Sequence, residues 1–306
     1  MRRSRLLKHL SSRHGAPDAG AGSDFPSGAD SLCVIDLAAG SLIPSAARIT
    51  ATMEVPEEFT KIESIFVRHR NALLLRGQFT PIYTDYYLHL MQHGIRPPGE
   101  LDQMLKDTLA MLALHLVARP WAESIAWTAS LRAPQMNLFV TGGSFDGSIT
   151  GRIFTEGVRE PDRNYFYAQT TTVDNSTPRL STLEIKGKDP IVWLSQYYDQ
   201  SEQRPARAFR LEDENFAIVA AQPDCDLGWL ESLDADAVAK ITETEETKIL
   251  ETRRFRFHCG CTIDKILTIL GGWKDRLDDL FGDEESINIQ CPRCAAKYRI
   301  TRDMIV

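Results

Sequence analysis

Phe257-His258-Cys259-Gly260-Cys261 and Cys291-Pro292-Arg293-Cys294 are the two stretches that decide the fold of the C-terminal part of the chain. Their spacing is typical of a zinc site, because tetrahedral zinc is bound by four soft thiolates. Each short pair directs two sulfurs inward from a turn, and the long insert lets the two turns approach one another. The sequence therefore predicts one Zn²⁺ bound by the four cysteines.

The residues around these pairs predict a small zinc-binding domain, residues 257–306. Apolar residues between the pairs fall at helical spacing, and those beside the second pair suggest strands. The helical set is Ile266, Leu267, Ile269, Leu270, Trp273, Leu277, Leu280 and Phe281, and the strand set is Ile287, Ile289, Tyr298 and Ile300. A domain this small gains only a few kcal/mol from its own core, whereas structural zinc contributes on the order of 10 kcal/mol in finger peptides. Zinc is therefore expected to hold it folded.

The other candidate ligands are interpreted as lying outside the zinc shell. His258 adjoins the first thiolate, but four cysteines already complete the coordination, so it is expected only to flank the site. Cys33 and Cys225 have no partner at ligand spacing. Six cysteines, mostly at one end, do not suit a secreted disulfide framework, so a reducing cytoplasm is the expected location.

Residues 56–203 predict an α+β domain, a two-layer arrangement of strands and helix. The segment 62–79 suggests paired strands, residues 101–116 carry the three- and four-residue apolar spacing of a core helix, and 121–191 returns to short apolar runs separated by turns. Residues 1–55 are rich in Arg, Ser, Gly and Ala, and predict a disordered or dispensable extension. A transit peptide for an organelle, or a start at Met53, are the alternatives.

Residues 204–256 predict a charged helical linker, with twelve acidic and eight basic residues. Leu230, Leu233, Val238 and Ile241 fall on one helical stripe, but residues 242–248 are poor in apolar groups and rich in threonine. Such a helix is marginal by itself. It is either a solvated linker or a segment that must unfold, and composition does not separate the two.

Charge and hydropathy exclude two classes of partner. The formal net charge is −7, and the zinc-binding domain has more acidic than basic residues even before the thiolates are counted, so nucleic acid is not expected. The most apolar stretch, residues 104–117, contains Lys106, Asp107 and His115. No membrane span is therefore expected.

Several motifs together resemble the 33 kDa chaperonin family of redox-regulated heat-shock chaperones. Besides the two cysteine pairs, they are Ala296-Lys297-Tyr298-Arg299-Ile300, Leu75-Arg76-Gly77 and the run Tyr197-Tyr198-Asp199-Gln200-Ser201-Glu202-Gln203. The resemblance covers roughly residues 60–306. The chain departs from the family at residues 133–135 and 222–225. Tyr197, Tyr198, Ser201, Glu202 and Gln203 are interpreted as structural, because no nucleophile and base accompany them.

The resemblance implies a holdase that is zinc-bound and inactive when reduced. Oxidation would link Cys259 with Cys261 and Cys291 with Cys294, release zinc and unfold a metastable linker docked beside the zinc-binding domain. Trp229, Leu230, Leu233 and Val238 would then bind unfolded client proteins, and the oxidised protein is expected to be a homodimer and not an enzyme. The alternatives are a zinc-ribbon nucleic-acid-binding or regulatory protein and, least favoured, a CxxC oxidoreductase.

Overall fold

The computed structural model describes residues 58–172 and 174–305. The predictions for residues 1–55, for Met53 as the start and for Cys33 lie outside these residues. No helix in the described ranges is long and apolar enough to cross a membrane.

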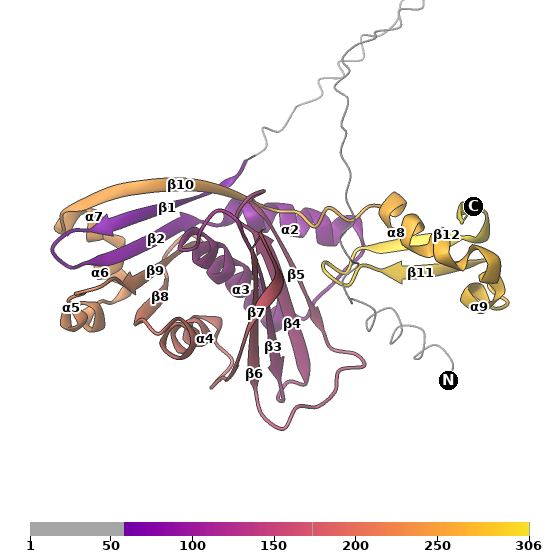
Figure 1. The fold of residues 1–306 in the computed structure, drawn as a ribbon, viewed down its shortest axis with the longest axis horizontal. Helices are drawn as coiled ribbons and strands as arrows, with labels where there is room; N and C mark the ends of the chain where they lie inside the picture. The colour runs from indigo at the N-terminus through magenta and orange to yellow at the C-terminus, as the bar shows by residue number, and fades with distance from the viewer. Residues whose placement is uncertain (1–57, 173, 306) are drawn as a thin grey trace, which may run out of the picture. The chain divides into compact units, whose positions relative to one another are not determined.

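Ten strands of the described chain form one mixed sheet (Figure 1). They are β1 (Thr60–Val67), β2 (Ala72–Gln78), β3 (Glu123–Leu131), β4 (Met136–Gly143), β5 (Ser148–Phe154), β6 (Tyr165–Thr172), β7 (Asn175–Glu184), β8 (Ala206–Arg210), β9 (Asn215–Ala221) and β10 (Thr247–Phe257). Their spatial order is β7-β6-β3-β4-β5-β10-β1-β2-β9-β8. All neighbours are antiparallel except β10 and β5, which pair in parallel over two residues. The α+β prediction is confirmed, with a larger sheet than expected.

The helices of the sheet domain are α2 (Thr80–Gln92), α3 (Gly99–Val117) and α4 (Pro190–Tyr197), the last continuing into a π-helical turn, Tyr198–Glu202. Helix α3 is the predicted core helix. It is buried along almost its whole length because apolar residues recur on several of its faces. Asp189 caps α4 by accepting a hydrogen bond from the Ile191 amide.

Residues 204–256 differ from the predicted helical linker. They contribute β8, β9 and β10 as well as three short helices, α5 (Leu227–Ser232), α6 (Ala235–Ala239) and α7 (Ile241–Thr244). Strand β10 pairs with β1 along its length. The physical reason is that cross-strand pairing gives this charged, threonine-rich segment the hydrogen bonds that an isolated helix would not retain.

The two faces of the sheet bury different cores. Along β9, Phe216, Ile218 and Ala220 belong to the core that includes α3, whereas the alternate residues Ala217, Val219 and Ala221 belong to a second core. Alternation along a strand places these sets on opposite faces. Helices α5, α6 and α7 contribute Leu230, Leu233, Val238 and Ile241 to that second core.

The C-terminal module, residues 258–305, follows β10 directly. It contains α8 (Ile263–Leu270), a 3₁₀ turn (Gly271–Arg276), α9 (Leu277–Phe281), the antiparallel hairpin of β11 (Ser286–Gln290) and β12 (Lys297–Thr301), and a final 3₁₀ turn (Arg302–Met304). These elements lie where the apolar spacing predicts helices and strands. In Figure 1 the module lies at one end of β10 and α5, α6 and α7 at the other. The predicted docking of the linker beside the zinc-binding domain is therefore not seen.

Candidate metal centre

The two cysteine pairs meet at the end of the β11–β12 hairpin. The last strand pair is Gln290 with Lys297, and the chain between them turns tightly, with Cys291 N donating to Ala296 O (2.8 Å) and Ala295 N to Cys291 O (3.0 Å). The first pair follows β10, where Gly260 has φ +67°, a conformation that costs glycine little. The two turns thus present their sulfurs to one another.

The four sulfur atoms of Cys259, Cys261, Cys291 and Cys294 all lie within 4.8 Å of one another. The Cys259 and Cys291 sulfurs are 3.7 Å apart, and those of Cys261 and Cys294 are 3.4 Å apart. A tetrahedral zinc ion with Zn–S bonds of about 2.3 Å requires sulfur separations of about 3.8 Å. The arrangement therefore fits a metal ion and is far from the roughly 2.05 Å of a disulfide.

The four thiols are close enough to shift one another's pKa values. Hydrogen bonds with Cys259 lower the pKa of Cys291 and lower that of Cys261 to about 6, whereas hydrogen bonds within the cluster raise the pKa of Cys259 and of Cys294. Tyr298 Oη also lies 3.3 Å from the Cys261 sulfur and 3.0 Å from its carbonyl oxygen. Thiolates are the form that binds zinc, so metal binding by all four cysteines would displace the protons that these hydrogen bonds share. His258 is exposed and does not belong to the cluster.

Residues of the sheet domain contact the second cysteine pair through its backbone. Arg152 on β5 donates to Cys291 O (2.9 Å), and His89 on α2 lies 2.9 Å from Cys294 O. Nothing in the sequence marks either residue, because each lies more than a hundred positions from its partner and resembles any other charged or polar surface residue.

The four client-binding candidates lie on or beside α5 and α6. Leu230, Leu233 and Val238 are at most 5% exposed, and Trp229 is half-buried. The second core keeps Leu230, Leu233 and Val238 from solvent, and Trp229 packs against it. Their role in client binding stays a prediction.

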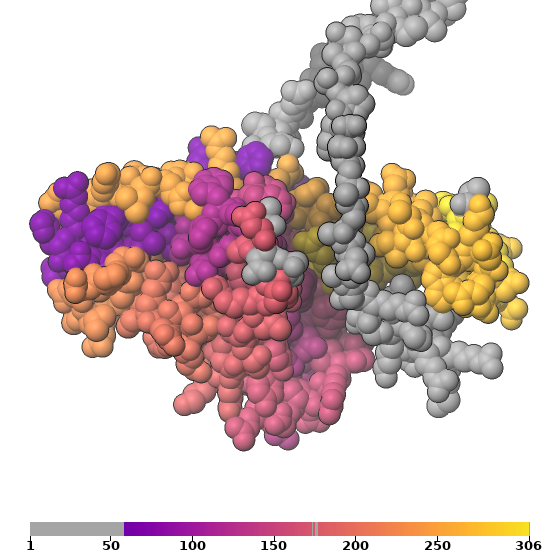
Figure 2. Space-filling view, viewed as in Figure 1, coloured from indigo at the N-terminus to yellow at the C-terminus, as the bar shows by residue number. Residues whose placement is uncertain are grey.

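The α5–α7 segment, residues 226–246, is bound at both ends by the tip of the β1–β2 hairpin. Arg70 donates to Asp226 at the start of α5 (2.7 Å) and to Glu245 after α7 (3.1 Å), and Arg68 donates to Glu246 (2.6 Å). Figure 2 shows the indigo hairpin against the orange surface of this segment. Cys225 packs against the same core and is isolated from the metal cluster.

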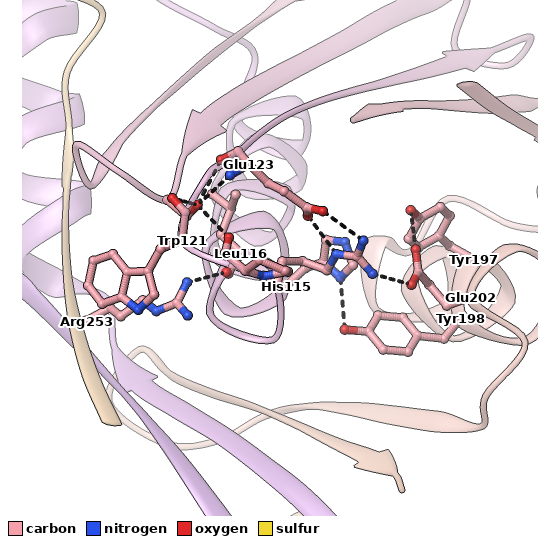
Figure 3. Close-up of polar contacts among 11 residues, drawn as sticks. His115, Leu116, Trp121, Glu123, Tyr197, Tyr198, Glu202 and Arg253 are labelled. Carbon is pink, nitrogen blue, oxygen red and sulfur yellow. Dashed lines mark hydrogen bonds and ion pairs between the residues drawn. The ribbon is translucent and has the colours of Figure 1, made fainter. Parts of the chain in front are cut away.

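The tyrosine motif forms a buried polar network remote from the cysteines (Figure 3). Tyr198 Oη lies 2.9 Å from His115 Nδ1, and Tyr197 donates to Glu202 (2.9 Å), which also accepts from Arg119 (2.8 Å). Gln203 ends the π-helical turn with φ +53°. The Ser201 and Ser181 hydroxyls are 2.7 Å apart. The structural role of the five motif residues stays a prediction.

The buried His115 makes stability depend on pH. Burial lowers the pKa of His115 well below its usual range, so the folded protein excludes a proton that the unfolded chain binds below about pH 6.5. Stability is therefore unaffected by this group above that pH. Below it, the free energy of unfolding is expected to fall by up to about 1.4 kcal/mol per pH unit.

Urea unfolding followed by fluorescence at pH 7.0 and 5.5 measures this effect. His115→Gln is expected to remove this part of the decrease, while His69→Gln, at a side chain 78% exposed, keeps it. Equal decreases in the wild type and His115→Gln would contradict the assignment.

Comparisons with known proteins agree with this combination of fold and cysteine cluster. The model of the Hsp33 protein family matches residues 210–301. The 33 kDa chaperonin of Bacillus cytotoxicus is 33% identical over 69 residues, and that of Caldanaerobacter subterraneus subsp. tengcongensis is 32% identical over 71. These matches span 22% and 23% of this chain, and 23% and 24% of the relatives' length.

The fold has a counterpart in a solved structure. The crystal structure of the 33 kDa chaperonin (heat shock protein 33 homolog) of Thermotoga maritima matches with a TM-score of 0.60 and 13% identity, over 81% of this chain and 97% of that one. The described chain is thus an α+β protein with a C-terminal four-cysteine site. Residues 210–301 are thus similar to the Hsp33, or 33 kDa chaperonin, family, in agreement with the resemblance read from the motifs. The family name is that of a chaperone, in agreement with the prediction that the chain is not an enzyme.

Proposed function

We propose that this protein is a cytoplasmic holdase chaperone controlled by the oxidation of one zinc-binding cysteine cluster. The observation that carries the proposal is the set of four converging sulfurs at the end of β10, a strand whose other end adjoins the buried α5–α7 segment. Zinc, when bound, fixes four thiolates in one arrangement and so stabilises a module with a small core.

Oxidation converts the four cysteine thiolates into two disulfides. A cysteine thiolate attacks a peroxide oxygen, giving a sulfenic acid and hydroxide, and the neighbouring thiolate then attacks that sulfur to form the S–S bond and displace a second hydroxide. We propose the pairs Cys259–Cys261 and Cys291–Cys294, because each lies within one short turn. Two disulfides consume two peroxide molecules and leave no thiolate for zinc.

Unfolding of the C-terminal module affects the α5–α7 segment through β10. Phe257, the last residue of β10, packs against Tyr86 and His89 of α2 with ring centroids 5.3 and 5.4 Å apart. When the module unfolds, His89 loses its contact with Cys294 O, and the packing of Phe257 on this end of α2 loosens. Loosening of β10 then frees Glu245 and Glu246 from the hairpin arginines, and α5–α7 separates to present Trp229, Leu230, Leu233 and Val238 to unfolded proteins. We propose that the opened form is a homodimer.

Oxidation of the reduced, zinc-loaded protein with hydrogen peroxide at elevated temperature tests the proposal. The expected result is loss of four thiols, release of one zinc per chain and suppression of the aggregation of a denatured client protein. Cys225→Ser should respond as the wild type does. Client protection that is equal with and without peroxide would refute the switch, and salt-sensitive binding of RNA or DNA by the reduced protein would favour a zinc-ribbon function instead.

A further inference from the structure

We propose that Arg152 and His89 are positioning residues that hold the second cysteine pair in its metal-binding conformation. The sheet domain then sets how readily the cysteine cluster gives up its metal. The inference deepens the proposed function and rests on it only for the link to chaperone activity, because metal retention is a property of the reduced protein alone.

Two side chains bracket the turn that carries Cys291 and Cys294. Arg152 donates through Nη1 to Cys291 O and through Nη2 to Gln290 Oε1, both at 2.9 Å. His89 Nε2 lies 2.9 Å from Cys294 O, and it must carry the proton because a carbonyl oxygen only accepts. The backbone at each end of the turn is therefore fixed from outside the module.

Both positioning residues are themselves anchored in the sheet domain. The Arg152 guanidinium lies 4.1 Å from the ring centroid of Phe154, its neighbour on the same face of β5. The His89 ring packs on Phe257, and His93 lies beside it with ring centroids 4.8 Å apart. Contacts within the sheet domain thus help to orient both side chains.

The end of α2 extends the contact to the first cysteine pair. Lys297 N donates to His93 Nδ1 (3.3 Å), and the His93 ring packs on Tyr298 at 5.7 Å between centroids. Tyr298 in turn donates to Cys261 O (3.0 Å). The helix therefore supports the second pair through His89 and reaches the first pair through one tyrosine.

The burial of the cysteines agrees with this asymmetry. Cys291 and Cys294 are 6% and 2% exposed, whereas Cys259 and Cys261 are half-buried. Outer-shell groups that orient metal ligands commonly change metal affinity 10- to 100-fold when they are removed. Here the groups that orient the ligands, Arg152 and His89, belong to the sheet domain. Any loosening of α2 or β5, for example by heat, is therefore expected to weaken metal binding as well.

Zinc transfer from the reduced, zinc-loaded full-length protein to a chromophoric chelator tests the inference. The variants are Arg152→Met, which keeps most of the apolar stem, and His89→Phe, which keeps the ring on Phe257 but not the hydrogen bond. We expect the double variant to transfer zinc about 10- to 100-fold faster than the wild type. Arg163→Met, at a side chain 62% exposed, is the matched control and should transfer at the wild-type rate.

The alternatives give different results. A packing role alone predicts a wild-type rate for His89→Phe, and that rate, in a double variant with wild-type circular dichroism and melting temperature, would overturn the proposal. If the double variant is not folded, the single variant Arg152→Met is measured instead, since methionine has no N–H donor for Cys291 O or Gln290, and an unchanged rate there has the same meaning. Faster transfer without any oxidant-dependent client protection would support the positioning residues and refute the chaperone switch. A wild-type protein that holds no zinc would refute both.

Discussion

Replacing Cys291 and Cys294 together by serine is expected to abolish tight zinc binding and to unfold residues 259–305, while the ten-stranded sheet stays folded. The module has few buried apolar residues, namely Leu270, Leu280, Phe281, Ala295, Ala296, Ile300 and Ile305. Such a core supplies a few kcal/mol at most, whereas structural zinc contributes on the order of 10 kcal/mol in finger peptides. Without the Cys291 and Cys294 thiolates, the stabilisation by zinc is lost.

The sheet should survive because its cores are separate. Neither the α3 core nor the α5–α7 core includes a residue after Phe257. Hydrogen exchange followed by mass spectrometry, with zinc quantified in the same sample, measures the outcome. We expect fast exchange over β11 and β12 and slow exchange over β2 and β9. Cys225→Ser is the control and should keep both zinc and protection. Protected β11 and β12 amides in a zinc-free variant would show that the module folds without metal.

Leu230→Ala is expected to produce client protection in the reduced, zinc-bound protein. Leu230 is 1% exposed and contributes to the small core beneath α5, α6 and α7. Truncating a buried leucine to alanine costs about 2–5 kcal/mol. The three short helices are joined to the sheet by this core, by the hairpin arginines and by Arg207 of β8, which donates to the carbonyl oxygens of Leu230, Glu231 and Leu233. Because these contacts are few and local, that loss is expected to open the segment rather than unfold the protein.

The same helix provides the matched control. Leu227→Ala makes the identical change at a residue 47% exposed, and should neither open the segment nor produce activity. Hydrogen exchange over residues 226–246, zinc content and aggregation assays under reducing conditions are measured together. If Leu230→Ala opens the segment but does not protect the client, this segment is not the client-binding surface. If it stays closed and inactive, the segment is not metastable.

The metal cluster could be predicted from sequence because its ligands are local. Cys259 with Cys261, and Cys291 with Cys294, reveal themselves by spacing, and a tetrahedral ion requires that the two pairs meet. The contacts of Arg152 and His89 could not be predicted, because they depend on the packing of β5 and α2 against a turn far along the chain.

Strand β9 shows why the linker prediction was wrong. Phe216–Ala221 is a continuous apolar run, which is the pattern of a strand buried on both faces. The region around this run is rich in charged residues, and that composition favours a linker over a strand. Strand β10 gave a weaker signal, since Ile249 and Leu250 lie at a bulge and are more than half exposed. Its identity as a strand depends on pairing with β1, which is a non-local contact.

The pairing of β1 with β10 also constrains the order in which the protein folds during synthesis. Thr60 pairs with Phe255, so β1 leaves the ribosome long before its partner on that side exists. Folding that depends on such distant pairing is slow, and the unpaired strand edge is exposed meanwhile. Only when residues 247–257 have emerged is this half of the sheet complete. The first cysteine pair follows immediately, so a nascent chain is expected to acquire its metal last, after the sheet that supports the site has formed.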